Sequence, residues 1–157
     1  MAYQKLQVGT GIAVIPSDTI DIPAVSGPVV DSTMTQVPPT TSIIVDSTQD
    51  FTAIQGLVGS TVIVGSSIAR VASVPSATQI TLDAAIAGTS AVGYKIYVKD
   101  SNPGCVLYVG GAGNVRVLTS SGADLTFVGI AAGTFMPVQV KRVYATDTTA
   151  TDIVALW

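Results

Sequence analysis

The feature that most constrains this chain is its large share of β-branched residues. Among 157 residues, Val and Ile together number 37 and Ser and Thr 33, whereas Leu numbers 7 and Glu is absent. β-Branched side chains pack well on pleated strands and lose rotamer freedom in helices, and the residues that helices prefer are scarce here. The composition therefore predicts an all-β protein.

Several classes of chemistry are excluded by residues that the chain lacks. It contains no histidine, and all ten acidic residues are aspartates. This removes histidine-dependent triads, histidine metal sites, the glutamate pair of glycosidases and the zincin motif. A net charge of −3 without a basic cluster argues against nucleic-acid binding. We expect that the chain is not an enzyme and has no catalytic, cofactor-binding or metal-binding residues. An aspartate-based hydrolase is the remaining enzymatic alternative.

The chain is unusually apolar for a solitary soluble domain. It is 48% hydrophobic and 11% charged, with a mean hydropathy of +0.57. The longest uncharged run, residues 51–69, is long enough to cross a membrane, but its apolar residues come in short bursts interrupted by glycines. The first residues lack the basic start and apolar core of a signal peptide, so we expect none. We therefore expect synthesis in the cytoplasm, no membrane association, and apolar surface buried between subunits.

Turn residues divide the chain into three parts. Residues 1–30 alternate short apolar runs with prolines, and residues 31–42 have the Ser, Thr and Pro content of an extended linker. The next part, residues 43–102, reads as a small barrel or sandwich of short strands, and residues 103–157 return to longer strands. The short strands are expected at 43–46, 61–64, 68–74, 79–82 and 94–98. The longer ones are expected at 105–109, 115–118, 124–128, 138–146 and 153–157.

The motifs that resemble chemical sites are better explained by structure. The glycines at 9–14 and 110–113 lack the following helix that a phosphate-binding loop requires, so we interpret them as turns. Asp46 and Asp50 lack the dense Asp/Asn-Gly loop of a calcium site, and we interpret them as solvated turn residues. The basic pair Lys141 and Arg142 is expected to neutralise an aspartate, and it breaks the strand alternation as a bulge would.

Two further residues have simple structural interpretations. Cys105 is the only cysteine and lies in an apolar run, which predicts a buried, unreactive thiol. Trp157 is the only tryptophan and ends an apolar run at the C-terminus. Because terminal residues fray unless they are held, we expect this end to be buried against the same or a neighbouring subunit.

The outer parts of the chain resemble a known family in five segments. These are residues 13–19 (AVIPSDT), 22–25 (IPAV), 107–115 (LYVGGAGNV), 127–143 (FVGIAAGTFMPVQVKRV) and 145–157 (ATDTTATDIVALW). They look like the head-spike-base and related structural proteins of tailed phages and gene transfer agents. In that family the IPAV-like segment leads almost directly into the LYVGG-like strand, whereas here about seventy residues intervene. The intervening segment is similar to small β-modules of phage structural proteins.

The resemblance implies a discontinuous, spike-base-like β domain formed by residues 1–30 and 103–157. This domain would be a β-sandwich or barrel, and the small barrel-like β domain at 43–102 would be inserted into it after the linker at 31–42. It also implies a virion protein on the capsid exterior, a head-decoration (cement) or spike-base protein that stabilises the capsid by packing of its subunits. The implied partners are the major capsid protein, further copies of the chain, as a trimer or alternatively a pentamer, and a spike fibre.

Apolar residues near the ends of the outer domain are expected at the subunit interface. They are Pro23, Val25, Phe135, Met136, Leu156 and Trp157. The alternative function is a receptor-binding, glycan-recognition or fibre-attachment module of the virion. Sugar rings stack on exposed aromatic side chains, and the inserted part offers three: Phe51, Tyr94 and Tyr97.

Overall fold

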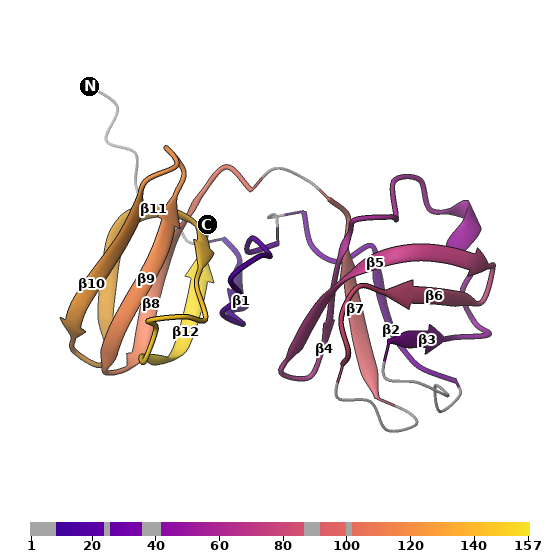
Figure 1. The fold of residues 1–157 in the computed structure, drawn as a ribbon, viewed down its shortest axis with the longest axis horizontal. Coiled ribbons are helices and arrows are strands. Elements are labelled where there is room, and N and C mark those ends of the chain that lie inside the picture. Colours follow the sequence, from indigo (N-terminus) through magenta and orange to yellow (C-terminus); the bar gives the residue numbers. More distant parts are fainter. Residues whose placement is uncertain (1–8, 24–25, 36–41, 87–91, 100–101) are drawn as a thin grey trace. The chain divides into compact units, whose positions relative to one another are not determined.

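The computed structural model describes residues 9–23, 26–35, 42–86, 92–99 and 102–157 and divides the chain into two units (Figure 1). Unit 1 contains residues 1–25 and 102–157, and unit 2 contains residues 26–101. Over the described ranges the chain forms twelve β-strands, one short 3-10 helix and no α-helix. The all-β prediction is confirmed.

Unit 1 is a six-stranded antiparallel sheet that curls around its own core, in the order β1-β12-β8-β11-β9-β10. The two segments of the unit meet in this sheet, because β1 from the N-terminal segment pairs with β12 at the C-terminus. Strand β11 pairs with β8 in its first half and with β9 in its second half. The strands are β1 (Gly11–Ala13), β8 (Cys105–Gly111), β9 (Gly113–Thr119), β10 (Asp124–Ile130), β11 (Thr134–Val143) and β12 (Thr151–Leu156).

The core of unit 1 follows from the alternation of side chains along these strands. Every second residue of β8, β9 and β12 points inward, and β11 adds three more inward side chains. The core is formed by Cys105, Leu107, Val109, Val115, Val117, Met136, Val140, Val143, Ile153 and Ala155, with Ile22 and Ala150 beside them. Buried Asn102 fastens the entering chain to this core, since its side-chain amide donates to the Ile22 carbonyl and its oxygen accepts from the Gly104 N–H. The buried thiol predicted for Cys105 is confirmed.

Unit 2 is a second antiparallel sheet of six shorter strands, in the order β2-β7-β4-β5-β6-β3. Its two end strands meet, because the Thr35 N–H after β2 donates to the Val45 carbonyl of β3 and the Ser47 N–H donates to the Thr35 hydroxyl. The sheet is thereby rolled up as a small barrel. Its elements are β2 (Val30–Thr33), β3 (Ile43–Val45), the 3-10 helix η1 (Phe51–Ala53), β4 (Thr61–Val64), β5 (Ser67–Ser76), β6 (Gln79–Leu82) and β7 (Gly93–Tyr97).

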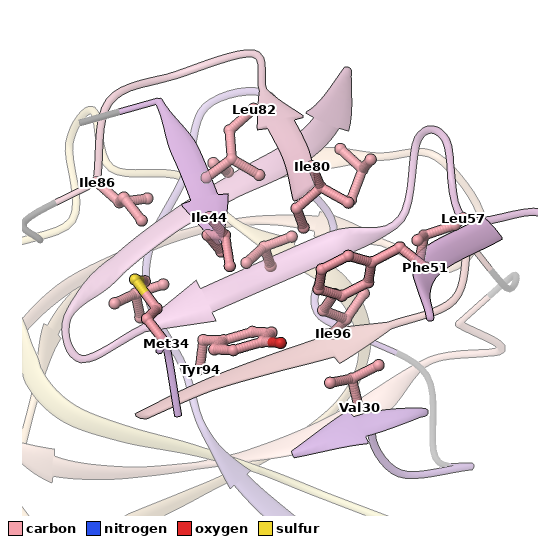
Figure 2. Packing of buried hydrophobic residues seen from close by; sticks show 14 residues of the cluster. Val30, Met34, Ile44, Phe51, Leu57, Ile80, Leu82, Ile86, Tyr94 and Ile96 are labelled. Atoms are coloured by element: carbon pink, nitrogen blue, oxygen red, sulfur yellow. The ribbon is translucent and has the colours of Figure 1, made fainter. Parts of the chain in front are cut away.

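The barrel of unit 2 encloses a continuous apolar core (Figure 2). Phe51 from η1 and Tyr94 from β7 point into it, with their ring centroids 6.5 Å apart. Met34 and Ile44 close the same core from the β2 and β3 side. All four side chains are at most 2% exposed.

Two features of the sequence were misread. The expected linker at 31–42 begins with strand β2, which pairs with β7 along its length, so the chain enters unit 2 before residue 31. Residues 36–41 of that expected linker lie outside the described residues. Strand β11 begins at Thr134, four residues earlier than expected, because Pro137 is accommodated where the β11–β8 register shifts between Met136 and Val140.

Candidate interaction surface

Over β8, β11 and β12 the outer face of the unit 1 sheet carries apolar side chains, as its inner face does. Alternate residues of β8 belong to the core, so Val106 and Tyr108 point to the opposite face. The pairing with β11 places Phe135 opposite Tyr108. The pairing with β12 places Val154 opposite Tyr108 and Leu156 opposite Val106. We call these five side chains the outer apolar face: Val106, Tyr108, Phe135, Val154 and Leu156.

The outer apolar face is open to solvent at Phe135 and closed at Val106, which is 8% exposed. Phe135 is 59% exposed, and Tyr108, Val154 and Leu156 are half-buried. The rings of Tyr108 and Phe135 lie side by side, with centroids 5.1 Å apart and an interplanar angle of 57°. Antiparallel sheets that cover one core usually present polar residues on their second face. An apolar second face is therefore suited to contact with another protein surface.

Two of the six residues expected at an interface belong to this face. Phe135 and Leu156 lie on the same side of the sheet, joined through Tyr108 and Val106 of β8. Tyr108, Val106 and Val154 complete the face but were not among the expected interface residues. The signal for them is present in the sequence, because the uninterrupted apolar run of β8 leaves no polar residue for an outer face. Val25 lies outside the described residues.

The other expected interface residues serve the interior of the unit itself. Met136 is 3% exposed, because it follows Phe135 directly and so points to the inner face. Pro23 is also buried. Trp157 packs against the core of its own chain. Its backbone N–H donates to the Thr10 carbonyl at 3.0 Å, and its indole N–H donates to the Asn102 side-chain oxygen at 3.4 Å. The C-terminus is thus held by the same subunit.

Both described arginines of unit 1 form ion pairs with aspartates. Arg142 contacts Asp21 at 2.6 Å and thereby ties the N-terminal segment to β11, which confirms for Arg142 the expected neutralisation of an aspartate. The predicted bulge is also present, as a register shift between Val140 and Arg142. Arg116 lies over the Tyr144 ring and contacts Asp124 at 2.8 Å, and this hydrogen bond lowers the pKa of Asp124. These pairs stabilise the fold and leave the outer apolar face uncharged.

Asp46 is the only buried charged residue among those described in unit 2, and its interpretation as a solvated turn residue is wrong. Its side chain is inaccessible to solvent and accepts hydrogen bonds from the Ser32 and Tyr94 hydroxyls on one oxygen, and from the Thr48 hydroxyl and N–H on the other. Burial alone would raise the pKa of Asp46, but the hydrogen bonds outweigh it and lower the pKa below that of an ordinary aspartate. Asp50 is exposed and caps η1, as a turn residue does.

The aromatic residues considered for sugar stacking are buried. Phe51 and Tyr94 are each 1% exposed within the unit 2 core, and Tyr97 is 8% exposed. Their rings therefore offer no open face to a ligand. Beside Phe51, an open hollow of about 420 Å³ is lined by apolar residues of η1, the following loop and β5, including Ile54, Leu57, Val58 and Val74. It carries no charged side chain that would orient a ligand.

The structure adds few other chemical groups. Within the described ranges no group of three or more Asp, Glu, His or Cys side chains is placed to hold a metal ion. Among the same residues no helix has the length and hydropathy needed to cross a membrane. Comparison with protein-family models, with curated proteins and with solved structures found no match to this chain. Among the described residues, the outer apolar face is therefore the candidate site with the clearest structural support.

Proposed function

We propose that this chain is a structural protein of a tailed-phage virion, a head-decoration or spike-base subunit without enzymatic activity. In this proposal it is bound on the capsid exterior, and its partners are the major capsid protein and further copies of itself. Unit 1 supplies the attachment, and unit 2 projects from it or bridges neighbouring subunits. The family resemblance of the two segments that make up unit 1 is the starting point for this assignment.

The observation that carries the proposal is the outer apolar face. A sheet with a complete core on one side has no need of Phe135, Tyr108, Val154 and Leu156 on the other side for its own folding. Full burial of a side chain such as Phe135 contributes about 1.5–3 kcal/mol. Several such residues, repeated over many copies on a shell, would bind subunits strongly without any chemical step.

The experiment uses particles made by the phage that encodes the chain. We expect the chain in purified particles by mass spectrometry, and cryo-electron microscopy to show it on the capsid surface in symmetric copies. Phe135→Ser is expected to reduce its occupancy on the particle several-fold. Val58→Ser is the matched control, because Val58 is equally exposed, at 58%, but lies in unit 2.

Three results would overturn the proposal. The first is absence of the chain from purified particles. The second is equal occupancy of wild type and Phe135→Ser. The third is binding of the purified chain to host surface glycans together with absence from the capsid, which would favour the receptor-recognition alternative.

A further inference from the structure

Strand β10 ends the unit 1 sheet with one long side unpaired. It pairs with β9 only, and no other described strand lies beside it in the sheet. Which of its backbone groups face outward follows from β9. The Arg116 N–H donates to the Thr148 hydroxyl and its carbonyl accepts from the Tyr144 N–H, so Arg116 directs its backbone groups away from β10.

Backbone direction alternates along a strand, so Val115 and Val117 direct their groups toward β10. Their partners are Phe127 and Leu125. Thr126, between these two, therefore turns its N–H and carbonyl to the open side, and Asp124 does the same. On the open side of β10, the backbone groups of Asp124 and Thr126 have no hydrogen-bond partner among the described residues.

The first half of this edge strand, Asp124–Phe127, has little of the usual protection against pairing with another chain. Edge strands are commonly guarded by lysine, proline, an inward charge or a bulge. β10 contains neither lysine nor proline, and its single charge, Asp124, lies at one end and is engaged by Arg116 at 2.8 Å. The bulge of β10 lies beyond Phe127, so Asp124–Phe127 remain in regular register.

We propose that two copies of this chain join through their β10 strands, paired antiparallel about a twofold axis at Thr126. Such a pair continues the two six-stranded sheets into one of twelve strands. The outward backbone groups restrict the register to pairings between outward residues, and among these we propose Thr126 opposite Thr126. Leu125 then lies opposite Phe127 of the second copy, and Asp124 faces the bulged end of the second β10 strand.

The exposed side chains of β10 independently fit this register. Leu125 lies on the core side of the sheet, opposite core residue Val117, yet it is 45% exposed because nothing covers it at the open edge. Phe127 lies on the same side and packs against the core. The proposed register brings Phe127 of the second copy across from Leu125 and so continues the apolar core from one subunit into the next. Antiparallel pairing also keeps the two Asp124 carboxylates at opposite ends of the contact.

Pairing with a second copy is more favourable through β10 than through β1, the strand at the other edge of the sheet. β1 has only three residues, against seven in β10. A β10–β10 contact is symmetric and closes at two subunits. It therefore predicts dimers or even-numbered assemblies, in place of the trimer or pentamer that the family resemblance implies. This contact uses neither the outer apolar face nor the capsid, so it does not depend on the proposed function.

The first test measures self-association of the full chain by analytical ultracentrifugation. A single strand pair buries less than the roughly 800 Å² per partner of a standard interface, so we expect a reversible dimer whose fraction rises with concentration. Thr126→Pro removes an outward N–H and leaves the β9 pairing intact, as proline at a strand edge can. We expect it to raise the dissociation constant about ten-fold or more. Ala13→Pro, at an outward position of β1, is the matched control and should dimerise like the wild type.

The second test checks the register and does not rely on a proline. Residues directly opposite in a hydrogen-bonded pair lie about 5.5 Å apart, within the range that a disulfide spans. Thr126→Cys is therefore expected to form a covalent dimer under mild oxidation. Val128→Cys is the control, because it is more exposed, at 76%, but would lie about 13 Å along the strand from its own copy. The native Cys105 is buried and does not interfere.

The outcomes separate the possibilities. A concentration-dependent dimer that Thr126→Pro weakens, with cross-linking of Thr126→Cys well above that of Val128→Cys, supports the contact. A monomer at all concentrations, a trimer or pentamer insensitive to Thr126→Pro, or equal cross-linking of the two cysteine variants overturns it. None of these results bears on whether Phe135→Ser loses its place on the particle, so the two proposals fail separately.

Discussion

Removal of the buried carboxylate of Asp46 should destabilise unit 2 and leave unit 1 unchanged. Its oxygens serve three hydroxyl groups and one backbone N–H, and the Tyr94 hydroxyl lies at 2.7 Å in the barrel interior. In Asp46→Ala the Tyr94 hydroxyl loses its partner and has no route to water. Ser32 and Thr48 are only partly enclosed, so their hydroxyls can turn to solvent.

The magnitude follows from these partners. A hydrogen bond to a charged group contributes about 1.5–3 kcal/mol, and a buried hydroxyl left without a partner costs about 1–3 kcal/mol. The substitution also removes the cost of burying a charge, which offsets part of the loss. We expect Asp46→Ala to lower the unfolding free energy of unit 2 by about 3–5 kcal/mol. A unit of this length has a total stability of only about 4–11 kcal/mol.

Asp46→Asn provides a graded comparison. The side-chain carbonyl oxygen of the asparagine can still accept a hydrogen bond from the Thr48 N–H, which as a backbone N–H can only donate. The amide nitrogen then faces Ser32 and Tyr94, whose hydroxyls can rotate to accept a hydrogen bond. We expect a loss of about 1–2 kcal/mol, smaller than that of the alanine variant.

The two units can be followed separately during urea unfolding. Trp157 is the only tryptophan and packs against the unit 1 core, so its fluorescence reports on unit 1. Far-UV circular dichroism reports on both units. Asp46→Ala should shift the transition seen by circular dichroism to lower urea and leave the Trp157 transition in place. Equal shifts of both signals, or a loss below about 1 kcal/mol, would refute this account of the Asp46 contacts.

Three further predictions follow from the described contacts. Because the pKa of Asp46 is lowered in the folded state, ionised Asp46 stabilises unit 2 above about pH 4, and this stabilisation is lost as the pH falls through the folded-state pKa. The difference in unfolding free energy between wild type and Asp46→Asn should therefore narrow between about pH 7 and pH 3 in urea titrations. Gly113→Ala should destabilise unit 1 by about 2 kcal/mol or more, since a Cβ there would lie 2.4 Å from the Ala150 nitrogen. Gly122→Ala, with open space around it, should cost about 1 kcal/mol, and Trp157 fluorescence during unfolding measures both losses. Burial raises the pKa of the Cys105 thiol to about 12, so a thiol reagent should modify it only as fast as unit 1 opens; rapid labelling of the native chain at neutral pH would contradict its placement.

Side-chain alternation and turn residues were enough to predict most strands. β3, β4, β6 and β9 lie within two residues of their expected bounds, because their apolar runs end at glycine or polar turns. β2 was missed because its sequence, VDST, has no apolar alternation. Its place depends on long-range partners: Asp31 contacts Lys95 at 3.1 Å and Ser32 donates to Asp46. No local pattern contains that information.

The candidate interface was predicted only in part, for a similar reason. Phe135 and Leu156 stood out as apolar residues near turns and the terminus. Which face of a strand a residue occupies depends on register, and a difference of one residue separates exposed Phe135 from buried Met136. Asp46 and Asp50 look alike in sequence, and only the arrival of Tyr94 and Ser32 from other strands makes one of them a core residue.

The contrast between the two units supports the proposal that the contacts with other subunits lie in unit 1. In unit 2 the end strands are joined through Thr35 and Val45, most of the described apolar side chains belong to one core, and buried Asp46 has its hydrogen-bond partners. In unit 1, by contrast, the sheet stops at β10 with backbone groups unused, and apolar side chains lie on both of its faces. Both features are what a contact with a second subunit would use. Substitutions that abolish assembly should therefore concentrate in β8, β10, β11 and β12, whereas exposed positions of unit 2 such as Val58 should tolerate change.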